Sequence, residues 1–209
     1  LGIEPGATES ESTKSLRTDL VDALIEHGQP KWLMDELAAR GRRVLGLGGD
    51  GRLAVDSVHR DLLAPSLRAA VMTDGAKAFD LAEQHLARKE DSVVRSALMA
   101  ALTSSKDVAL MKRALALGLG THVKSGEMGR IYFSAASDPA LHPLLWDFVI
   151  GHYDAFVAKV PSVWQGKVVY YASVAACTAQ GAEQLQQFFG ERAKNLDGGP
   201  RAVAQSVEG

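Results

Sequence analysis

Three glycines, Gly46, Gly48 and Gly51, have the spacing of a G-x-G-x-x-G phosphate-binding turn. In a dinucleotide-binding protein such a turn follows a β-strand and opens a helix, which lets the backbone approach the pyrophosphate. Here the glycines follow an arginine-rich helix end, and no strand pattern flanks them. We therefore interpret residues 46–58 as an irregular, glycine-rich surface loop and not as a cofactor site.

Histidine and cysteine side chains are the usual protein ligands of zinc. The six histidines never occur as H-E-x-x-H, the spacing that places two imidazoles on one helix face with a glutamate as general base. Cys177 has no second thiol to pair with, and we expect a buried, reduced, small apolar side chain. No G-x-S-x-G nucleophile turn occurs. The sequence thus predicts no catalytic residue, no metal site and no cofactor in this chain.

One polar group lies next to an apolar helix pattern and could contact a ligand. It comprises His122, Lys124, Glu127, Arg130 and Tyr132. The last four residues are the candidate site, which we name the Lys124 patch. One interpretation is a helix start with solvated charges. The other is a binding patch on the concave side of a curved helical array, the side that such arrays use for binding.

Charge and hydropathy exclude two classes of partner. The chain has 23 basic and 25 acidic residues, a formal net charge of -2. Binding to a phosphate backbone needs a basic excess, so nucleic acid is not expected as a partner. No apolar run approaches the ~20 residues that span a bilayer, so no membrane span is expected.

The apolar periodicity is helical along the whole chain. Gly28 is expected to end the first helix, and Pro30 to open the second. The apolar stripe of the first helix comprises Leu16, Leu20, Val21, Leu24 and Ile25. The clearest helix start is Asp138-Pro139, where the carboxylate can cap free N–H groups and proline suits the first helical position.

The helix expected after Asp138 is apolar on two faces, as far as Val157. Such a helix is packed on two sides and therefore belongs to a layered array. We predict an all-α fold, a HEAT-like α-solenoid of about ten or eleven antiparallel helices joined by short turns. Residues 1–209 are expected to form a single helical-repeat domain, with the irregular loop at 46–58.

Five stretches, in the same order, resemble the C-terminal helical domain of zinc aminopeptidases. The family includes aminopeptidase N, puromycin-sensitive aminopeptidase and the endoplasmic-reticulum aminopeptidases. Residues 65–71 resemble its Leu-Arg-x-x-Val helix, 105–110 its x-Asp-x-x-Leu helix start and 123–127 its Val-Arg-Ser-Gln-Asp helix start. Residues 138–148 resemble its Asn-Pro … Ala-Trp-x-Phe helix, and 188–189 with 199–208 resemble its closing segment.

The resemblance implies a function that this chain does not perform alone. In the parent enzyme a separate N-terminal domain holds zinc through H-E-x-x-H and a further glutamate, and removes N-terminal residues from peptides. The helical domain caps the active-site cavity and limits or guides the access of peptides, so the Lys124 patch would face peptide. Such enzymes occur in the cytoplasm, in the periplasm and as membrane-anchored ectodomains.

An alternative is a freestanding helical-repeat scaffold that binds a protein partner. The chain begins at Leu1 without a methionine and stops within a helical pattern, so we expect a fragment of a larger chain. The two hypotheses differ in surface. A domain separated from its enzyme should expose an apolar patch near its first helices, where the missing domain docks.

Overall fold

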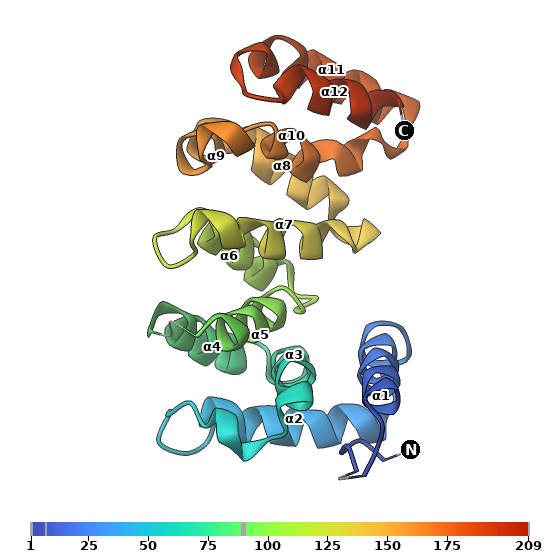
Figure 1. The fold of residues 1–209 in the computed structure, drawn as a ribbon. Coiled ribbons are helices and arrows are strands. Elements are labelled where there is room, and N and C mark those ends of the chain that lie inside the picture. Colours follow the sequence, from blue (N-terminus) through green and yellow to red (C-terminus); the bar gives the residue numbers. More distant parts are fainter. Residues whose placement is uncertain (1, 7, 89–90, 209) are drawn as a thin grey trace. The chain divides into compact units, whose positions relative to one another are not determined.

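The structure, a computed structural model, describes residues 2–6, 8–88 and 91–208 (Figure 1). In these ranges all regular secondary structure is helical. The α-helices are α1 (Glu11–Ala23), α2 (Lys31–Leu45), α3 (Leu63–Asp74), α4 (Ala76–Arg88), α5 (Ser92–Leu102), α6 (Val108–Leu119), α7 (Met128–Ala136), α8 (His142–Gly151), α9 (Tyr153–Lys159), α10 (Lys167–Ala172), α11 (Ala179–Arg192) and α12 (Gly199–Glu208). The predicted all-α class is confirmed.

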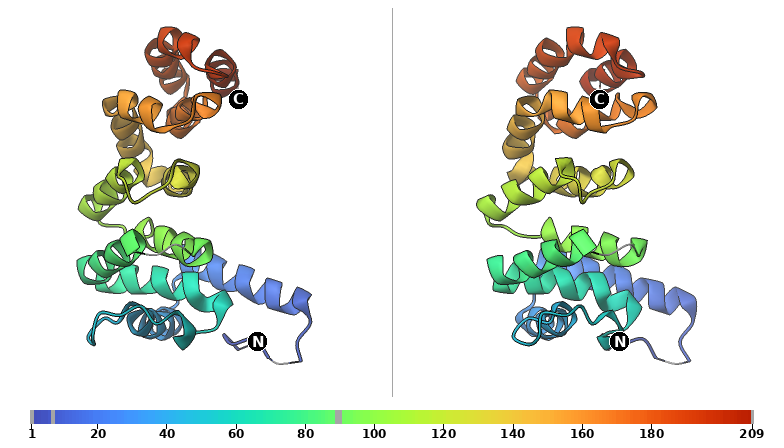
Figure 2. Two further views of the ribbon diagram at one scale, coloured as in Figure 1. Left: turned by 60° about the vertical axis from the view of Figure 1, so that its left-hand side comes forward. Right: turned by 90° about the vertical axis from the view of Figure 1, so that its left-hand side faces the viewer.

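The chain forms two compact units, Leu1–Met111 and Lys112–Gly209. Within each unit, helices pack on helices that are near in sequence: α2 on α3 and α3 on α5 in the first, α11 on α12 and α8 on α10 in the second (Figures 1 and 2). Local packing of this kind is what an α-solenoid requires. A single domain over residues 1–209 stays a prediction.

In the first unit, α2 and α3 meet at very short range because Gly41 has no side chain. A Cβ atom at this position would lie 2.1 Å from the Ser66 carbonyl oxygen and 2.7 Å from the Ala70 Cβ. Any larger residue would push the helices apart, so the close packing depends on glycine. The core cluster beside this contact comprises Val21, Ile25, Leu33, Leu37, Ala38, Leu62 and Ala69.

Helix α1 and the residues that follow it contribute only one edge of the predicted apolar stripe to that core. Val21 and Ile25 are buried, whereas Leu16, Leu20 and Leu24 are 52%, 46% and 38% exposed. The five residues of the stripe thus do not share one environment. Periodicity identifies the apolar face of a helix but not which neighbours cover it.

The end of this first helical segment differs from the prediction. After Ala23 the chain continues through one π-helical turn, η1 (Leu24–Gly28). The left-handed residue that stops it is Gln29, with φ of 44°, whose N–H donates to the Leu24 carbonyl at 2.5 Å. Gly28 thus lies one residue before the left-handed position, because a π-helical turn contains one more residue than an α-helical turn. The predicted start of the next helix at Pro30 is confirmed.

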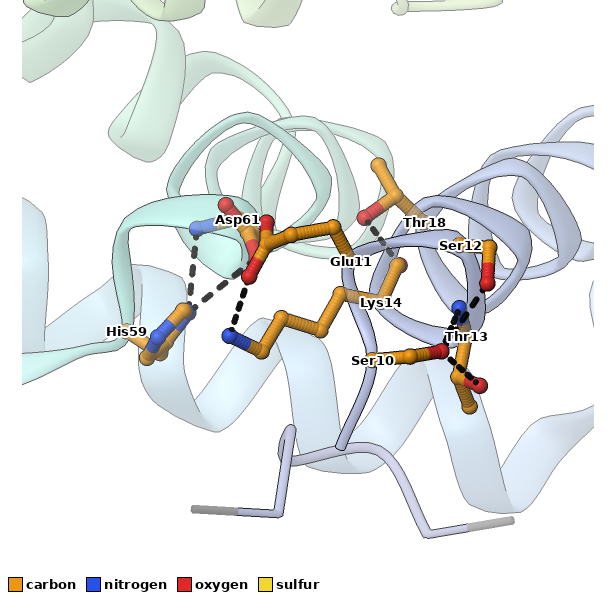
Figure 3. Close-up of polar contacts among 8 residues, drawn as sticks. All are labelled: Ser10, Glu11, Ser12, Thr13, Lys14, Thr18, His59 and Asp61. Atoms are coloured by element: carbon orange, nitrogen blue, oxygen red, sulfur yellow. Dashed lines mark hydrogen bonds and ion pairs between the residues drawn. The ribbon is translucent and has the colours of Figure 1, made fainter. Parts of the chain in front are cut away.

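The first turn of α1 is capped and lies beside a short 3₁₀ turn, η3 (Arg60–Leu62) (Figure 3). The Ser10 hydroxyl accepts from the Thr13 N–H at 3.2 Å, and Lys14 Nζ donates to Glu11 Oε1 at 2.7 Å. That hydrogen bond, and more weakly the charge of Asp61, raise the pKa of Lys14. The start of α1 is thereby held by both local and tertiary contacts.

In the second unit, the segment expected as one long helix is broken into α8 and α9 at His152. The His152 ring donates from Nδ1 to the Phe148 carbonyl at 2.8 Å and stacks on the Phe148 ring at 4.3 Å. The ring thus adds a second donor to a carbonyl at the C-terminal end of α8, which also accepts from the His152 backbone N–H at 3.1 Å. This break is one reason why the described ranges hold twelve α-helices where we predicted ten or eleven.

The predicted start at Asp138 is confirmed. The Asp138 carboxylate accepts from the Ala140 N–H at 3.0 Å, and Pro139 occupies the first position of the 3₁₀ turn η5 (Pro139–Leu141) that leads into α8.

We expect Asp138→Ala to lower the free energy of unfolding by about 1 kcal/mol, because the N–H groups of the first turn lose their acceptor. Chemical denaturation of the wild-type and variant chains measures this change. Asp138→Asn, which can still accept, should lose much less. Equal stability of the alanine variant and the wild type would contradict this capping role.

Candidate functional site

The Lys124 patch begins at a turn that the chain fixes locally. The Glu127 carboxylate accepts from the Lys124 backbone N–H at 2.9 Å, across the short turn η4 (Ser125–Glu127) that leads into α7. The Ser125 hydroxyl donates to the Lys159 carbonyl at 2.8 Å, and Lys159 Nζ donates to the Gly120 carbonyl. The end of α9 therefore holds the loop in front of α7. Glu127 acts here as a capping residue.

Tyr132 does not lie on the surface of the patch. It is fully buried, and its hydroxyl donates to the Leu115 carbonyl at 3.0 Å. Its ring packs against Phe156 and Tyr171, with centroids 4.8 and 5.0 Å away. Burial raises the pKa of this phenol, so it stays a hydrogen-bond donor. Tyr132 is a core residue of the second unit and is not accessible to a peptide.

The exposed members of the patch are therefore Lys124 and Arg130, with Glu127 half-buried between them in sequence. Phe133, one helical turn after Gly129, is 50% exposed and lies edge-on to Tyr171 at 5.1 Å. Two cations and one exposed ring can contact an anionic or aromatic group. In the described structure the Glu127 carboxylate accepts from the Lys124 backbone N–H, so it serves the turn before α7.

A second candidate surface, which the sequence analysis missed, lies between α10 and α12. It is a groove of about 350 Å³. Its lining consists of Val163, Trp164, Gly166, Lys167, Tyr170, Asp197, Gly198, Arg201 and Gln205. We name it the Trp164 groove. The sequence signal that could have indicated it is the Trp164–Lys167 spacing of three residues, which places a ring and a cation side by side on helical turns.

Contacts inside the Trp164 groove hold its walls together. Lys167 Nζ lies 4.6 Å from the centroid of the Trp164 ring, a cation–π distance. The Tyr170 hydroxyl donates to Gln205 Oε1 at 2.6 Å, which connects α10 to α12. The Gly166 N–H donates to the Asp197 carbonyl at 3.0 Å.

Histidine and cysteine residues in the described ranges do not form a metal centre. No group of three or more His, Cys, Asp or Glu side chains suited to a metal ion occurs there. Three histidines instead bond backbone carbonyls: His85 that of Leu45, His142 that of Ala136 and His152 that of Phe148.

Cys177 is exposed, which corrects the expectation of a buried thiol. It ends the 3₁₀ turn η7 (Ser173–Cys177), directly before Thr178 caps α11, and such a junction lies at the surface. No helix of the described chain is both long and apolar enough to cross a membrane.

The described part of the chain is all-helical, and its two candidate surfaces are the Lys124 patch and the Trp164 groove. Comparison with known families matches residues 1–209 to the ERAP1-like C-terminal domain. The chain belongs to this family, as the sequence resemblance predicted, and is therefore part of an aminopeptidase. A search of curated proteins finds no match to the chain.

The position of Tyr132 gives a testable prediction. Tyr132→Phe should lower the free energy of unfolding by about 1 kcal/mol, because the buried hydroxyl loses its bond to Leu115. Tyr132→Ala should cost about 3–5 kcal/mol, because it leaves a cavity among aromatic rings. Urea titration of the three proteins measures both values. If Tyr132→Ala were as stable as the wild type, the side chain would have to be exposed.

Proposed function

We propose that this chain is the non-catalytic C-terminal domain of a zinc aminopeptidase, and that it caps the active-site cavity and limits or guides the access of peptides. The catalytic domain that precedes it supplies the zinc ligands and removes N-terminal residues from peptides. The chain itself contributes a docking face and binding surfaces. The family membership supports this proposal, and one surface feature carries it further.

That feature is the exposed apolar edge of α1 and the first residue of η1. Leu16, Leu20 and Leu24 are spaced four residues apart and lie on one helix face, and all three are exposed. Trp32, in the first turn of α2, is 63% exposed. Large exposed apolar side chains that recur on one face mark an interaction site. This is the feature that distinguishes a domain separated from its enzyme from a self-contained scaffold.

The first residues of the chain cover another face of α1. Arg17 Nε donates to the Gly2 carbonyl at 2.8 Å, and the guanidinium also pairs with Glu9. Arg40 Nη2 pairs with Glu4 at 2.8 Å, and Ile3 packs against the core cluster. These contacts leave the exposed leucines uncovered. Because the family membership supports a preceding catalytic domain, we assign the leucine edge to that domain.

Docking of tethered domains loses less entropy than association of separate chains. A covalently linked partner is present at high effective concentration, so a modest apolar contact suffices. Leu16, Leu20 and Leu24 are 52%, 46% and 38% exposed, so covering the rest of each contributes about half of the 1.5–3 kcal/mol for full burial. Together with Trp32 they offer the capping domain a modest apolar contact.

The docking face is tested by the triple variant Leu16→Gln, Leu20→Gln and Leu24→Gln, because glutamine keeps helix propensity but removes apolar surface. In the 209-residue chain, the free energy of unfolding should change by only about 0.5 kcal/mol per site, since the side chains are exposed. In the parent enzyme the same changes should lower the melting temperature of this domain and increase the cleavage of bulky peptides relative to single-residue substrates.

A matched control is Val93→Gln, at an exposed apolar position in the first turn of α5. It should leave the parent enzyme unaffected. If the triple variant also leaves both the melting temperature and the peptide selectivity of the parent unchanged, α1 is not the docking face.

A second prediction concerns zinc. The purified 209-residue chain should hold far less than one zinc per molecule and should release no N-terminal residue from peptides, because the H-E-x-x-H ligands belong to the preceding domain. Elemental analysis after dialysis, with a peptidase assay on the same sample, measures this. Stoichiometric zinc would refute a non-catalytic role.

A further inference from the structure

We infer that the residues before α1 form a latched strap, and that α1 opens away from the first unit as one local element when this strap is released. The described residues of the strap are 2–6 and 8–10. The inference concerns the 209-residue chain itself and does not rest on the proposed function. Such an arrangement is a conformational device, because an element that opens locally can adjust its position when a partner docks.

Helix α1 has a small apolar contact with the rest of the unit. Of its 13 residues, all of them described, only Arg17 and Val21 are buried. In α3, by comparison, seven of the 12 residues are buried. The next apolar anchor is Ile25, in the π-turn that follows α1. Figures 1 and 2 show α1 along the outside of the α2–α3 pair. The part of α1 before Val21 is therefore held mainly by polar contacts.

The central polar contact is made by Arg17, which is 5% exposed. Its Nε donates to the Gly2 carbonyl at 2.8 Å, and its guanidinium pairs with the Glu9 carboxylate. The hydrogen bond from Arg17 lowers the pKa of Glu9, so this carboxylate is ionised at neutral pH. Gly2 and Glu9 both belong to the strap. One side chain of α1 thus binds the strap near its beginning and near its end.

The strap also reaches α2. Arg40 Nη2 donates to the Glu4 carboxylate at 2.8 Å, and the same guanidinium pairs with Glu36 on α2. The Arg40 side chain is largely buried, and Ile3 packs against the core cluster. The strap therefore connects α1 to α2 through two arginines, one on each helix.

Two features make this latch weaker than the core beneath it. Among the described residues, Arg17 Nη1 and Glu9 Oε2 are buried atoms without a hydrogen-bond partner. Burial of unpartnered polar atoms costs free energy, and opening of α1 returns both atoms to water. A further ion pair, from Asp22 to Arg68 of α3, spans 3.4 Å and is weak for that reason. Opening of α1 should thus cost less free energy than unfolding of the whole unit.

The test is amide hydrogen exchange of the 209-residue chain under native conditions, followed by mass spectrometry. Protection factors are compared between the middle of α1 and the middle of α3. We expect the α1 amides to be at least about tenfold less protected than the α3 amides, because α1 opens locally whereas α3 opens with the whole unit.

Variants assign this opening to the strap. Arg17→Met keeps an apolar stem but removes the latch, and should lower the protection of α1 about tenfold without changing that of α3. Glu9→Gln tests the same ion pair at a more exposed position, and should act in the same direction. Arg40→Met should lower the protection of α1 about threefold, although Arg40 lies on α2, because it releases the strap there. Arg43→Met, at an exposed position of α2, is the matched control and should have no effect.

Three results would overturn the inference. The first is equal protection of α1 and α3 in the wild type. The second is an equal loss of protection in both helices on Arg17→Met or Glu9→Gln, which would make the ion pair a support of the whole unit. The third is the same effect of Arg40→Met and Arg43→Met on α1. None of these results bears on the docking of the leucine edge, which is tested on the melting temperature and selectivity of the parent enzyme.

Discussion

No helix in the described part of this chain can stand alone, and this constraint governs the rest of the structure. The longest α-helix there, α2, has 15 residues, a length at which an isolated helix is marginal in water. Each helix therefore gains its stability by covering an apolar face against helices near it in sequence. Gly41 is an example of this close packing, since at that position α2 and α3 approach so closely that a Cβ atom does not fit between them.

The same constraint explains why α1 is informative. It covers Val21 and Ile25 but leaves Leu16, Leu20 and Leu24 exposed. Because the other helices cover one another, the uncovered apolar edge at the first helix is a candidate docking surface. The salt bridges of Arg17 and Arg40 hold the first residues against α1 and α2 and do not cover that edge. Stability and function are thus connected, because the apolar surface that the helices leave exposed is the one that we propose to dock against the catalytic domain.

Local signals were predictable from the sequence because they depend on one or two residues. Asp138 caps its turn and Pro30 precedes α2, as their types and positions indicated. The all-helical class followed from periodicity. The π-turn ending at Gln29 and the break at His152 could not be predicted in this way. They depend on a backbone adjustment and on a side chain that bonds a carbonyl, and apolar spacing reports neither.

Sites were harder to predict than elements, for a related reason. Tyr132 stands among charged residues in the sequence, yet the helical turn directs it into an aromatic core. Trp164 and Arg201 are distant in the sequence and share a groove only because α10 packs on α12. A short polar cluster in sequence is thus a weak guide to a binding surface in a layered helical fold.

The most direct test of the central claim is the reading frame that precedes Leu1 in the gene. We expect an H-E-x-x-H sequence followed by a further glutamate some turns later, in frame with this chain, as the ligands of a catalytic zinc. A start codon close to Leu1, with no such motif before it, would contradict the account and would leave a freestanding helical scaffold.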